Sequence, residues 1–257
     1  MDRSTLMEYM QRVGLSEIPP CTAEGIKTVQ QAHLRNLPFE NLDIIEGRIP
    51  LDLSEEALVD KMIRRRRGGI CYEMNTLLSL VYSAMGFTTH MKAARIKPDG
   101  TFLDHVFVLV EVPTENGDIE YWMSDGGFAF NYQTPLLFQM GLVQNDGRCD
   151  YRLDEAPDVG EGYVNLMRMD DGVWTVAMTI APGYVTREEY QVRCDYYATN
   201  PNSRFKQGAV VGIDCPEGRI TLSSNHIITY ENGIRVSKDL DSPEQFKEYL
   251  HDIFDLD

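Results

Sequence analysis

The chain has 257 residues, of which 43% are hydrophobic and 25% are charged, the composition of an ordinary globular protein. Its formal net charge of −16 disfavours nucleic acid as a partner, because neutralising phosphates requires a basic surface. The longest fully apolar run, 106–110, is far too short to cross a bilayer, and the N-terminus lacks the long apolar core of a secretory signal. We therefore expect no membrane partner.

The cysteines point to a reducing compartment and to a thiol that is available for chemistry. No two of them show the C-x-x-C spacing of a zinc or redox site, so we expect no metal. Their number is odd, and without a signal peptide a cytoplasmic location is expected. The five cysteines are Cys21, Cys71, Cys149, Cys194 and Cys215.

Helical patterns dominate the chain up to about residue 87. Ser4 is placed to cap a short helix that Gly14 ends, and helical spacing of apolar residues continues over 22–37. Ser54, followed by two glutamates, predicts a third helix that runs on to four successive arginines, 64–67.

These arginines are the one local concentration of positive charge, and two interpretations are open. They form either a solvated helix end, where cations favour the C-terminal dipole, or the cationic site that an anionic cosubstrate would need. Gly68 and Gly69 break this helix, and a new one begins near Cys71 and stops at Gly86.

The middle of the chain changes to strand patterns. Residues 113–117 read as a hairpin loop, 145–160 as an acidic loop, and Ser242 as the cap of a final helix that runs to about 254. The predicted strands are 104–111, 119–123, 163–169, 173–180 and 220–229. Helices, then strands, then a mixed tail predict an α+β protein rather than a wound parallel sheet.

Cys71 is the strongest candidate for a catalytic residue. A cysteine in the first turn of a helix lies where unpaired backbone N–H groups converge, and the helix dipole there stabilises a thiolate. The same N–H groups are suited to bind the oxyanion of an acyl-transfer intermediate. The alternative is a buried and inert cysteine, which the Gly-Gly-x-Cys start of this helix makes less favourable.

A thiol nucleophile needs a base, and His105 at the start of an apolar strand is the candidate. Asp104 is a poor orienter of His105, since neighbours on a strand point to opposite faces. Asp125 is the better one: a loop over 113–117 places it directly opposite His105, whereas a two-residue turn would place Phe128 there. Without further support, Asp125 as a solvated turn residue is an equal alternative.

The arrangement of these residues resembles the arylamine N-acetyltransferase family. The segment around the cysteine, Arg67-Gly68-Gly69-x-Cys71-x-Glu73-x-Asn75, is similar to the active-site motif of that family. Weaker matches agree in order and spacing from about residue 9 to 222. They are Tyr9-x-x-Arg12-Val13-Gly14-Leu15, Pro38-Phe39-Glu40-Asn41-Leu42, His105, Asp125-x-Gly127-Phe128 and Pro201-x-Ser203-x-Phe205.

The resemblance implies a fold in three parts: a helical bundle (1–87), a β-barrel (88–190) and a C-terminal α/β lid (191–257). The first two parts together are similar to the core of papain-like thiol enzymes. It implies that acetyl-CoA, as cosubstrate, acetylates Cys71 in a ping-pong reaction. An arylamine, arylhydrazine or N-hydroxyarylamine then takes the acetyl group, as in xenobiotic metabolism. His105 would pair with the thiolate and Asp125 would orient His105. No bound cofactor is implied, and the oligomeric state is left open.

Further residues are expected to belong to the site. Arg67, Glu40, Glu73 and Asn75 are expected to form a hydrogen-bonded support beneath it, because buried charges require partners, and a catalytic role is the alternative. Substrate-binding residues would be Phe39 and Phe128, which line an apolar acceptor pocket, and Ser203, which contacts CoA. Core packing for the two phenylalanines and a turn role for the serine are the alternatives.

Two departures from the family pattern are visible. Asp125-Gly126-Gly127-Phe128-Ala129 replaces the usual Asp-Val-Gly-Phe-Gly, and the stretch from His105 to Asp125 is long, which predicts an extended hairpin. These departures leave two alternative functions open. The first is a papain-like thiol hydrolase or amide synthase, which acetyl-CoA would not acylate. The second is a non-catalytic homologue, whose Cys71 would react slowly with iodoacetamide.

Overall fold

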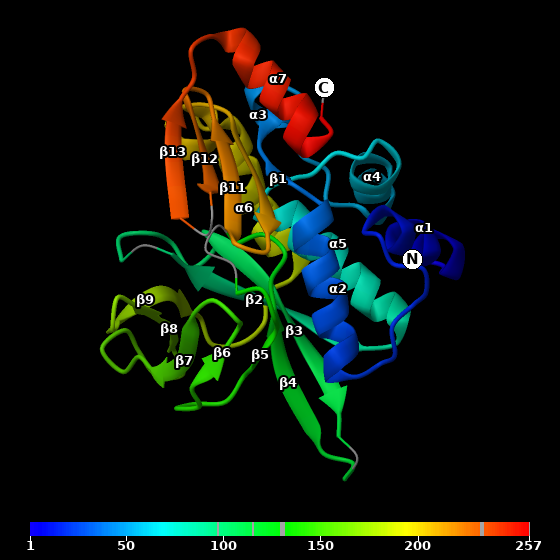
Figure 1. Ribbon diagram of the computed structural model, residues 1–257. Coiled ribbons are helices and arrows are strands. Elements are labelled where there is room, and N and C mark those ends of the chain that lie inside the picture. Colours follow the sequence, from blue (N-terminus) through cyan, green and yellow to red (C-terminus); the bar gives the residue numbers. More distant parts are fainter. Residues whose placement is uncertain (97, 115, 129–131, 232–233, 257) are drawn as a thin grey trace.

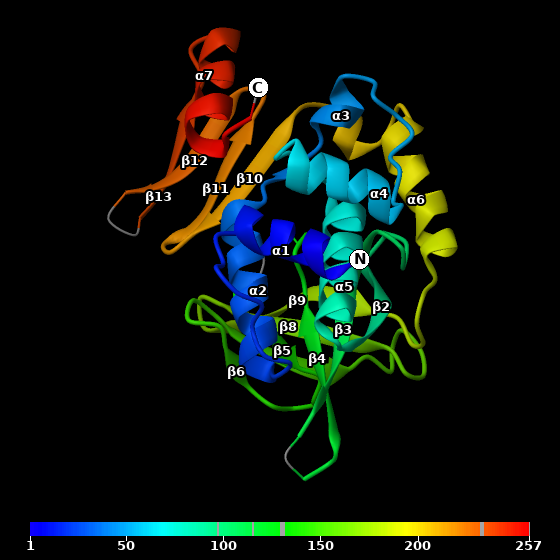
Figure 2. The same cartoon turned by 90° about the vertical axis from the view of Figure 1, so that its right-hand side faces the viewer.

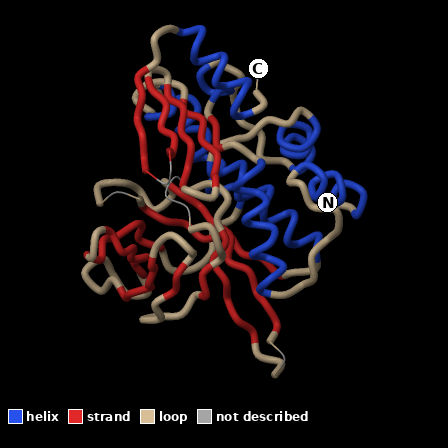
Figure 3. Tube along the Cα trace, in the orientation of Figure 1, coloured by secondary structure: helices blue, strands red, loops and turns tan. Residues whose placement is uncertain are grey.

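A computed structural model describes residues 1–96, 98–114, 116–128, 132–231 and 234–256. The N-terminal part is helical, as expected, and α5 (Cys71–Met85), the last helix of that part, lies at its centre (Figures 1 and 3). Its elements are α1 (Arg3–Arg12), α2 (Ala23–Asn36), β1 (Phe39–Glu40), α3 (Leu42–Ile45), α4 (Glu55–Leu58), the π-helical η1 (Val59–Arg64) and α5 (Cys71–Met85). Among the described helices, none has the length and apolar character that a membrane crossing requires.

Side-chain caps explain where these helices begin. The Asp2 carboxylate accepts a hydrogen bond from the Thr5 N–H, so Asp2 caps α1. The prediction of Ser4 as the cap is wrong. Ser54 caps α4 as predicted, and the chain runs on through η1 towards the arginines. Gly86 ends α5 with a φ of +107°, a left-handed conformation that favours glycine.

The barrel is formed by an antiparallel sheet that is nearly closed on itself. Among the described residues its strand order is β5-β4-β3-β2-β9-β8-β7-β6, and Figure 2 shows it below the helices. The strands are β2 (Thr88–Arg95), β3 (His105–Pro113), β4 (Ile119–Ser124), β5 (Leu136–Leu137), β6 (Gln144–Asn145), β7 (Asp150–Glu155), β8 (Val164–Asp170) and β9 (Val173–Ile180). The hairpin β3–β4 projects beyond the barrel (Figure 1).

Strand β3 joins the two larger cores, which explains its unbroken apolar sequence. Val106, Val108 and Val110 pack among the helices, whereas Phe107 and Leu109 face the barrel interior. A strand that is buried on both faces needs apolar residues at every position. The packing of β3 against α5 brings the start of the strand to the start of that helix.

A second antiparallel sheet forms the C-terminal part, in the order β1-β10-β11-β12-β13. Its edge strand β1 comes from the N-terminal part and pairs Phe39 with Gly212 of β10. The final helix α7 packs on β10 and β11 (Figure 1). The remaining elements are α6 (Arg187–Thr199), the 3₁₀ turn η2 (Arg204–Lys206), β10 (Val210–Cys215), β11 (Gly218–Ser223), β12 (His226–Glu231), β13 (Ile234–Asp239) and α7 (Pro243–Phe254).

The α+β class and the three-part arrangement are confirmed, with local corrections. The segment 145–160, predicted as a loop, contains β7, whose alternate residues Tyr151 and Leu153 are buried in the barrel. The segment 220–229, predicted as one strand, is divided between β11 and β12. Ser242 caps α7 as predicted. The exact division of the chain at residues 87 and 190 stays a prediction.

Candidate active site

Cys71 is the first residue of α5 and is buried, with 2% of its surface exposed. The preceding glycines allow the chain to pass very close to its neighbours. A Cβ at position 68 would lie 1.7 Å from the Pro38 carbonyl oxygen, and one at position 69 would lie 2.8 Å from a Glu73 carboxylate oxygen. The two glycines therefore place the thiol at the start of α5 against the segment that carries Phe39. Phe39 itself forms an isolated β-bridge with Gly69.

His105 lies between Cys71 and Asp125. Its Nε2 atom is 2.6 Å from Oδ2 of Asp125, and its ring lines the same small cavity as the Cys71 thiol. Since Nε2 faces the carboxylate, Nδ1 is the ring nitrogen left for the sulfur. Asp104, in contrast, binds Thr101, Arg193 and Tyr197, so its side chain is directed away from His105 as expected.

The register behind the His105–Asp125 contact differs from the predicted one. Val112 pairs with Glu120 and Pro113 with Ile119, so the hairpin loop begins one residue later than expected. The ladder ends at the pair Val108–Ser124, and Asp125 lies beyond it. The observed pairing is shifted from the predicted one by an even number of residues, and an even shift keeps each side chain on the same face of the sheet. His105 and Asp125 therefore still make contact, although they are not directly opposite each other.

The surroundings of His105 favour its charged form. Burial alone would lower the pKa of the imidazole, but the charge of Asp125, the hydrogen bond to it and the Cys71 thiol together raise the pKa to about 10. A histidine with this pKa is protonated at neutral pH. The structure therefore places a protonated imidazolium beside the sulfur of Cys71.

Buried amides hold Asp125 in place. Asn75 donates from Nδ2 to Oδ1 of Asp125 at 2.9 Å and accepts the Gly126 N–H at 2.8 Å. Oδ1 of Asp125 also accepts the Gly127 N–H at 2.9 Å. On the other side, Oε1 of Gln30 accepts the Asp125 N–H at 3.2 Å. The sequence had indicated Asn75 but not Gln30, whose only signal was a polar residue on the buried face of α2.

The glycines of the altered motif are in close contacts. A Cβ at position 127 would lie 2.6 Å from the Cα of Cys71, so only glycine fits beside the nucleophile without a shift. A Cβ at position 126 would lie 2.6 Å from Nε2 of His33, whose ring fills that space. Ala129, the last residue of the motif, lies outside the described residues.

A buried network of charges lies beneath the first turn of α5. Arg67 binds Glu40 at 2.8 Å, and Lys61 binds both Glu73 and Asp43 at 2.7 Å. Burial would lower the pKa of the Lys61 ammonium, but the nearby carboxylates outweigh it and raise that pKa. Oε2 of Glu73 also accepts the Ile70 N–H at 3.0 Å, which fixes the residue before Cys71.

This network contains three of the four expected support residues, Arg67, Glu40 and Glu73. Lys61 and Asp43 were not predicted, because their sequence neighbourhoods resemble ordinary exposed helix faces. The other arginines of the run, Arg64, Arg65 and Arg66, form exposed ion pairs with Glu8, Asp60 and Asp255. The interpretation of the run as a cationic binding site is therefore not supported by its geometry.

A small cavity of about 50 Å³ opens onto the thiol. Both predicted wall residues, Phe39 and Phe128, line it, and the Phe128 ring lies 5.2 Å from that of His105. The complete lining is Phe39, Cys71, Ile96, His105, Gly127, Phe128 and Arg204.

A second cavity of about 190 Å³ shares Ile96 and Arg204 with the first. Ser203 lines it, but its hydroxyl oxygen accepts the Phe205 N–H at 3.2 Å and so caps η2. Arg193 and Arg204 also line this cavity, and Arg193 is bound there to Asp104 at 2.8 Å. The arginines were not predicted as site residues, since they are isolated in the sequence.

The described histidines, cysteines, aspartates and glutamates form no group that could hold a metal ion. The chemistry that the described geometry supports is nucleophilic attack by Cys71, assisted by His105.

Comparison with known proteins agrees with this site. The sequence model of a family described as N-acetyltransferase matches residues 22–257. An arylamine N-acetyltransferase of Mycolicibacterium smegmatis is 30% identical, over 97% of this chain and 90% of its own. A Salmonella typhimurium protein, an arylamine N-acetyltransferase / N-hydroxyarylamine O-acetyltransferase, is 28% identical over 91% of this chain and 82% of its own.

Solved structures show the same fold. The arylamine N-acetyl transferase of M. smegmatis superimposes with a TM-score of 0.89 at 29% identity, covering 100% of this chain and 93% of the other. The Mycobacterium marinum arylamine N-acetyltransferase, solved in complex with CoA, gives a TM-score of 0.88 at 26% identity, covering 98% and 92%. The fold and these relatives define an acyltransferase with a mixed α+β fold. The chain belongs to the arylamine N-acetyltransferase family.

Proposed function

We propose that the protein transfers an acetyl group from acetyl-CoA to an arylamine, arylhydrazine or N-hydroxyarylamine through Cys71. The observation that carries the proposal is the buried alignment of Cys71, His105 and Asp125, with 2.6 Å between the histidine and the carboxylate. This alignment supplies a nucleophile, a proton carrier and an orienting group.

In the first half-reaction, the Cys71 thiolate attacks the thioester carbonyl of acetyl-CoA. The resulting oxyanion lies near the N–H groups of the first turn of α5, which lack partners within the helix. As the tetrahedral intermediate collapses, the carbon–sulfur bond to CoA breaks. The CoA thiolate leaves and takes the proton from His105, and Cys71 remains acetylated.

In the second half-reaction, the amine nitrogen attacks the acetyl carbon on Cys71 and passes its proton to His105. Collapse of this intermediate releases the acetylated amine and restores the thiolate beside the imidazolium. Asp125 keeps the ring in one orientation through both steps, since Nε2 stays bound to it.

The cavity lined by Arg193, Arg204 and Ser203 is the site that we assign to the phosphate-bearing part of CoA. A protein with a net charge of −16 needs local cations to receive this anion, and the two arginines lie next to the thiol cavity. Ser203 contributes to its wall. Phe39 and Phe128 form the apolar boundary against which the acceptor ring packs.

The thiol cavity is small relative to the substrates. At about 50 Å³ it has room for an acetyl group but not for an aryl ring as well. The acceptor must therefore displace part of the wall or enter from its open side. We place the reaction in the cytoplasm and in the metabolism of foreign amines, in keeping with the free cysteines.

The deciding experiment is an intact-mass spectrum after incubation with acetyl-CoA and without an acceptor, with Cys71→Ala in parallel. We expect a single acetyl group on the wild type, none on the variant, and discharge upon addition of an arylamine. An unacetylated wild type whose Cys71 is still alkylated rapidly would instead support another acyl donor. An unacetylated protein with slow alkylation would support the non-catalytic alternative.

A further inference from the structure

Arg219 connects the C-terminal sheet to the wall of the thiol cavity. It lies on β11, and its side chain is 15% exposed. The guanidinium crosses the neighbouring strand over Gly212, where a Cβ would lie 2.7 Å from Nη2. It ends above the ring of Phe39, with 5.8 Å between the guanidinium carbon and the ring centroid.

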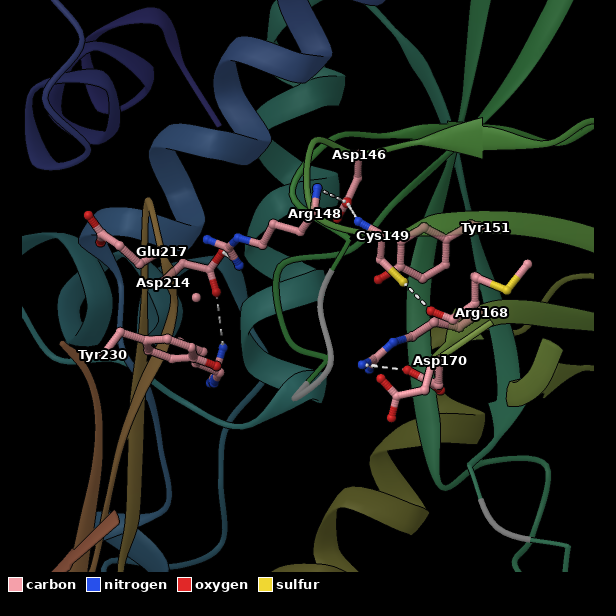
Figure 4. Close-up of a pocket in the computed structure, with 13 residues that line it drawn as sticks. Asp146, Arg148, Cys149, Tyr151, Arg168, Asp170, Asp214, Glu217 and Tyr230 are labelled. Atoms are coloured by element: carbon pink, nitrogen blue, oxygen red, sulfur yellow. Dashed lines mark hydrogen bonds and ion pairs between the residues drawn. The ribbon is translucent and has the colours of Figure 1, made fainter. Parts of the chain in front are cut away.

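A tight ion pair does not explain this position. Nη1 of Arg219 is 3.9 Å from Oδ1 of Asp214, and that oxygen has no hydrogen-bond partner among the described residues. The other oxygen of Asp214 is 3.3 Å from Arg148, which reaches across from the barrel (Figure 4). The three side chains border a polar cavity of about 580 Å³ between the barrel and the C-terminal sheet.

The remaining contacts of Arg219 lead to the reaction site. Phe39 pairs with Gly212 through β1 and β10, and it bridges to Gly69 just before the nucleophile. Its ring is flanked by Phe205, with 6.0 Å between centroids, and it lines the cavity that contains Cys71. The guanidinium therefore occupies the space into which the ring of Phe39 would otherwise move.

We infer that Arg219 is a positioning residue that holds Phe39 against the thiol cavity, and thereby sets how tightly the aryl group of the acceptor is held. The inference rests on the proposed acyl transfer for its consequence in catalysis. The position of Phe39 itself governs access to Cys71, which can be measured without acetyl-CoA.

The test compares alkylation of Cys71 by an aryl reagent, N-phenylmaleimide, with alkylation by the small reagent iodoacetamide, each located by peptide mass spectrometry. In Arg219→Ala the ring of Phe39 gains space, so the ratio of the aryl rate to the small-reagent rate should rise about tenfold. Arg219→Lys, which keeps the charge and much of the length, should restore most of the wild-type ratio. If the alanine variant folds poorly, Arg219→Met is used instead, because methionine fills much of the space of arginine without its charge.

A double-mutant cycle with Phe39→Ala decides whether the effect passes through this ring. If it does, Arg219→Ala changes the ratio little in the Phe39→Ala background, and the two effects are strongly non-additive. Arg148→Ala is the matched control, because it removes the other partner of Asp214 and a contact between barrel and sheet without touching Phe39. Its ratio should equal that of the wild type.

Additive effects in the cycle, or an equal change in Arg148→Ala, would overturn the inference in favour of a general loosening of the C-terminal part. With a working acetyl transfer, Arg219→Ala should also raise KM for the arylamine about fivefold and leave the rate of Cys71 acetylation unchanged. If acetyl-CoA does not acetylate the wild type, the proposed function fails, while the alkylation ratio still decides the role of Arg219.

Discussion

Asn75 lies one helical turn beyond Cys71 on α5 and binds Asp125 by its side chain, with 2.9 Å between Nδ2 and Oδ1. The same amide donates to the Val106 carbonyl at 2.7 Å, next to His105. One helix thus carries both the nucleophile and the residue that fixes the other two members of the arrangement. Because the spacing along α5 is rigid, a shift of the helix would move all three together.

Removal of the Asn75 amide should therefore damage geometry and stability together. In Asn75→Ala the Val106 carbonyl and the Gly126 N–H lose a buried partner, which should lower the free energy of unfolding by about 1–3 kcal/mol. Alkylation of Cys71 should slow because His105 is held less firmly. Urea unfolding and the iodoacetamide rate measure the two effects. A variant with normal alkylation and lower stability would restrict Asn75 to a structural role.

Because the pKa of His105 is raised in the folded protein, this residue should add to the free energy of unfolding at neutral pH, and this contribution should be lost at high pH. Because the folded-state pKa, about 10, is above the unfolded value of 6.5, the contribution is complete below pH 6.5 and disappears as the pH rises through 10. The wild type should lose stability relative to His105→Gln over this interval. Urea unfolding of both proteins between pH 6 and pH 10 checks the sign, and parallel curves would contradict it.

The lowered pKa of His33 predicts that the protein loses stability as the pH is lowered. Burial and the charge of Arg12 lower its pKa to about 3, against the opposing effect of Asp125. Between pH 6.5 and 3 the unfolded chain binds a proton at this residue and the folded protein does not, so stability should fall as the pH is lowered. Replacement in His33→Gln should reduce that fall. Thermal or urea unfolding from pH 7 to pH 4 tests the difference, and an unchanged slope would exclude His33 as its cause.

Lys61 should be among the most sensitive residues outside the thiol cavity. Lys61→Met leaves the carboxylates of Asp43 and Glu73 without their shared cation, and breaking a buried pair costs about 3–5 kcal/mol. The pKa of Asp43, which burial raises but Lys61 and Arg67 lower to about 2, should then rise. Arg65→Met removes an exposed pair and should unfold like the wild type. Equal unfolding curves for both variants would refute the role of the network.

Arg204 tests the site assigned to CoA. Arg204→Met should raise KM for acetyl-CoA about tenfold and weaken its dependence on salt, because one charge-assisted contact to phosphate is lost. The rate of alkylation by iodoacetamide, which carries no charge, should change little. Steady-state kinetics at two ionic strengths provide the comparison. An unchanged KM would place the phosphates elsewhere on the surface.

The sequence allowed prediction of those parts of the site that depend on local chemistry. Gly68, Gly69 and Cys71 indicate a helix start and a close approach of backbone, and both are present. The contact between His105 and Asp125 was predicted from an incorrect register, and it survived because an even shift preserves the face.

The parts that were missed depend on long-range contacts. Lys61 and Gln30 have ordinary helical surroundings in sequence, and only the packing of distant segments buries them. Strand β7 was mistaken for a loop because its outward residues are charged, while Tyr151 and Leu153 alone face the core. Strand β1 is two residues long, which is too short for any periodicity to reveal.

That short strand makes completion of the enzyme a late event in its synthesis. Phe39 leaves the ribosome early, but its partner Gly212 follows 173 residues later by numbering, and Asn41 likewise waits for the Val210 N–H and the Phe205 carbonyl. Until then the nascent chain presents an unpaired strand edge and an unfinished pocket wall. A chain released before residue 210 would carry Cys71, His105 and Asp125 and still lack one side of the chamber in which they act.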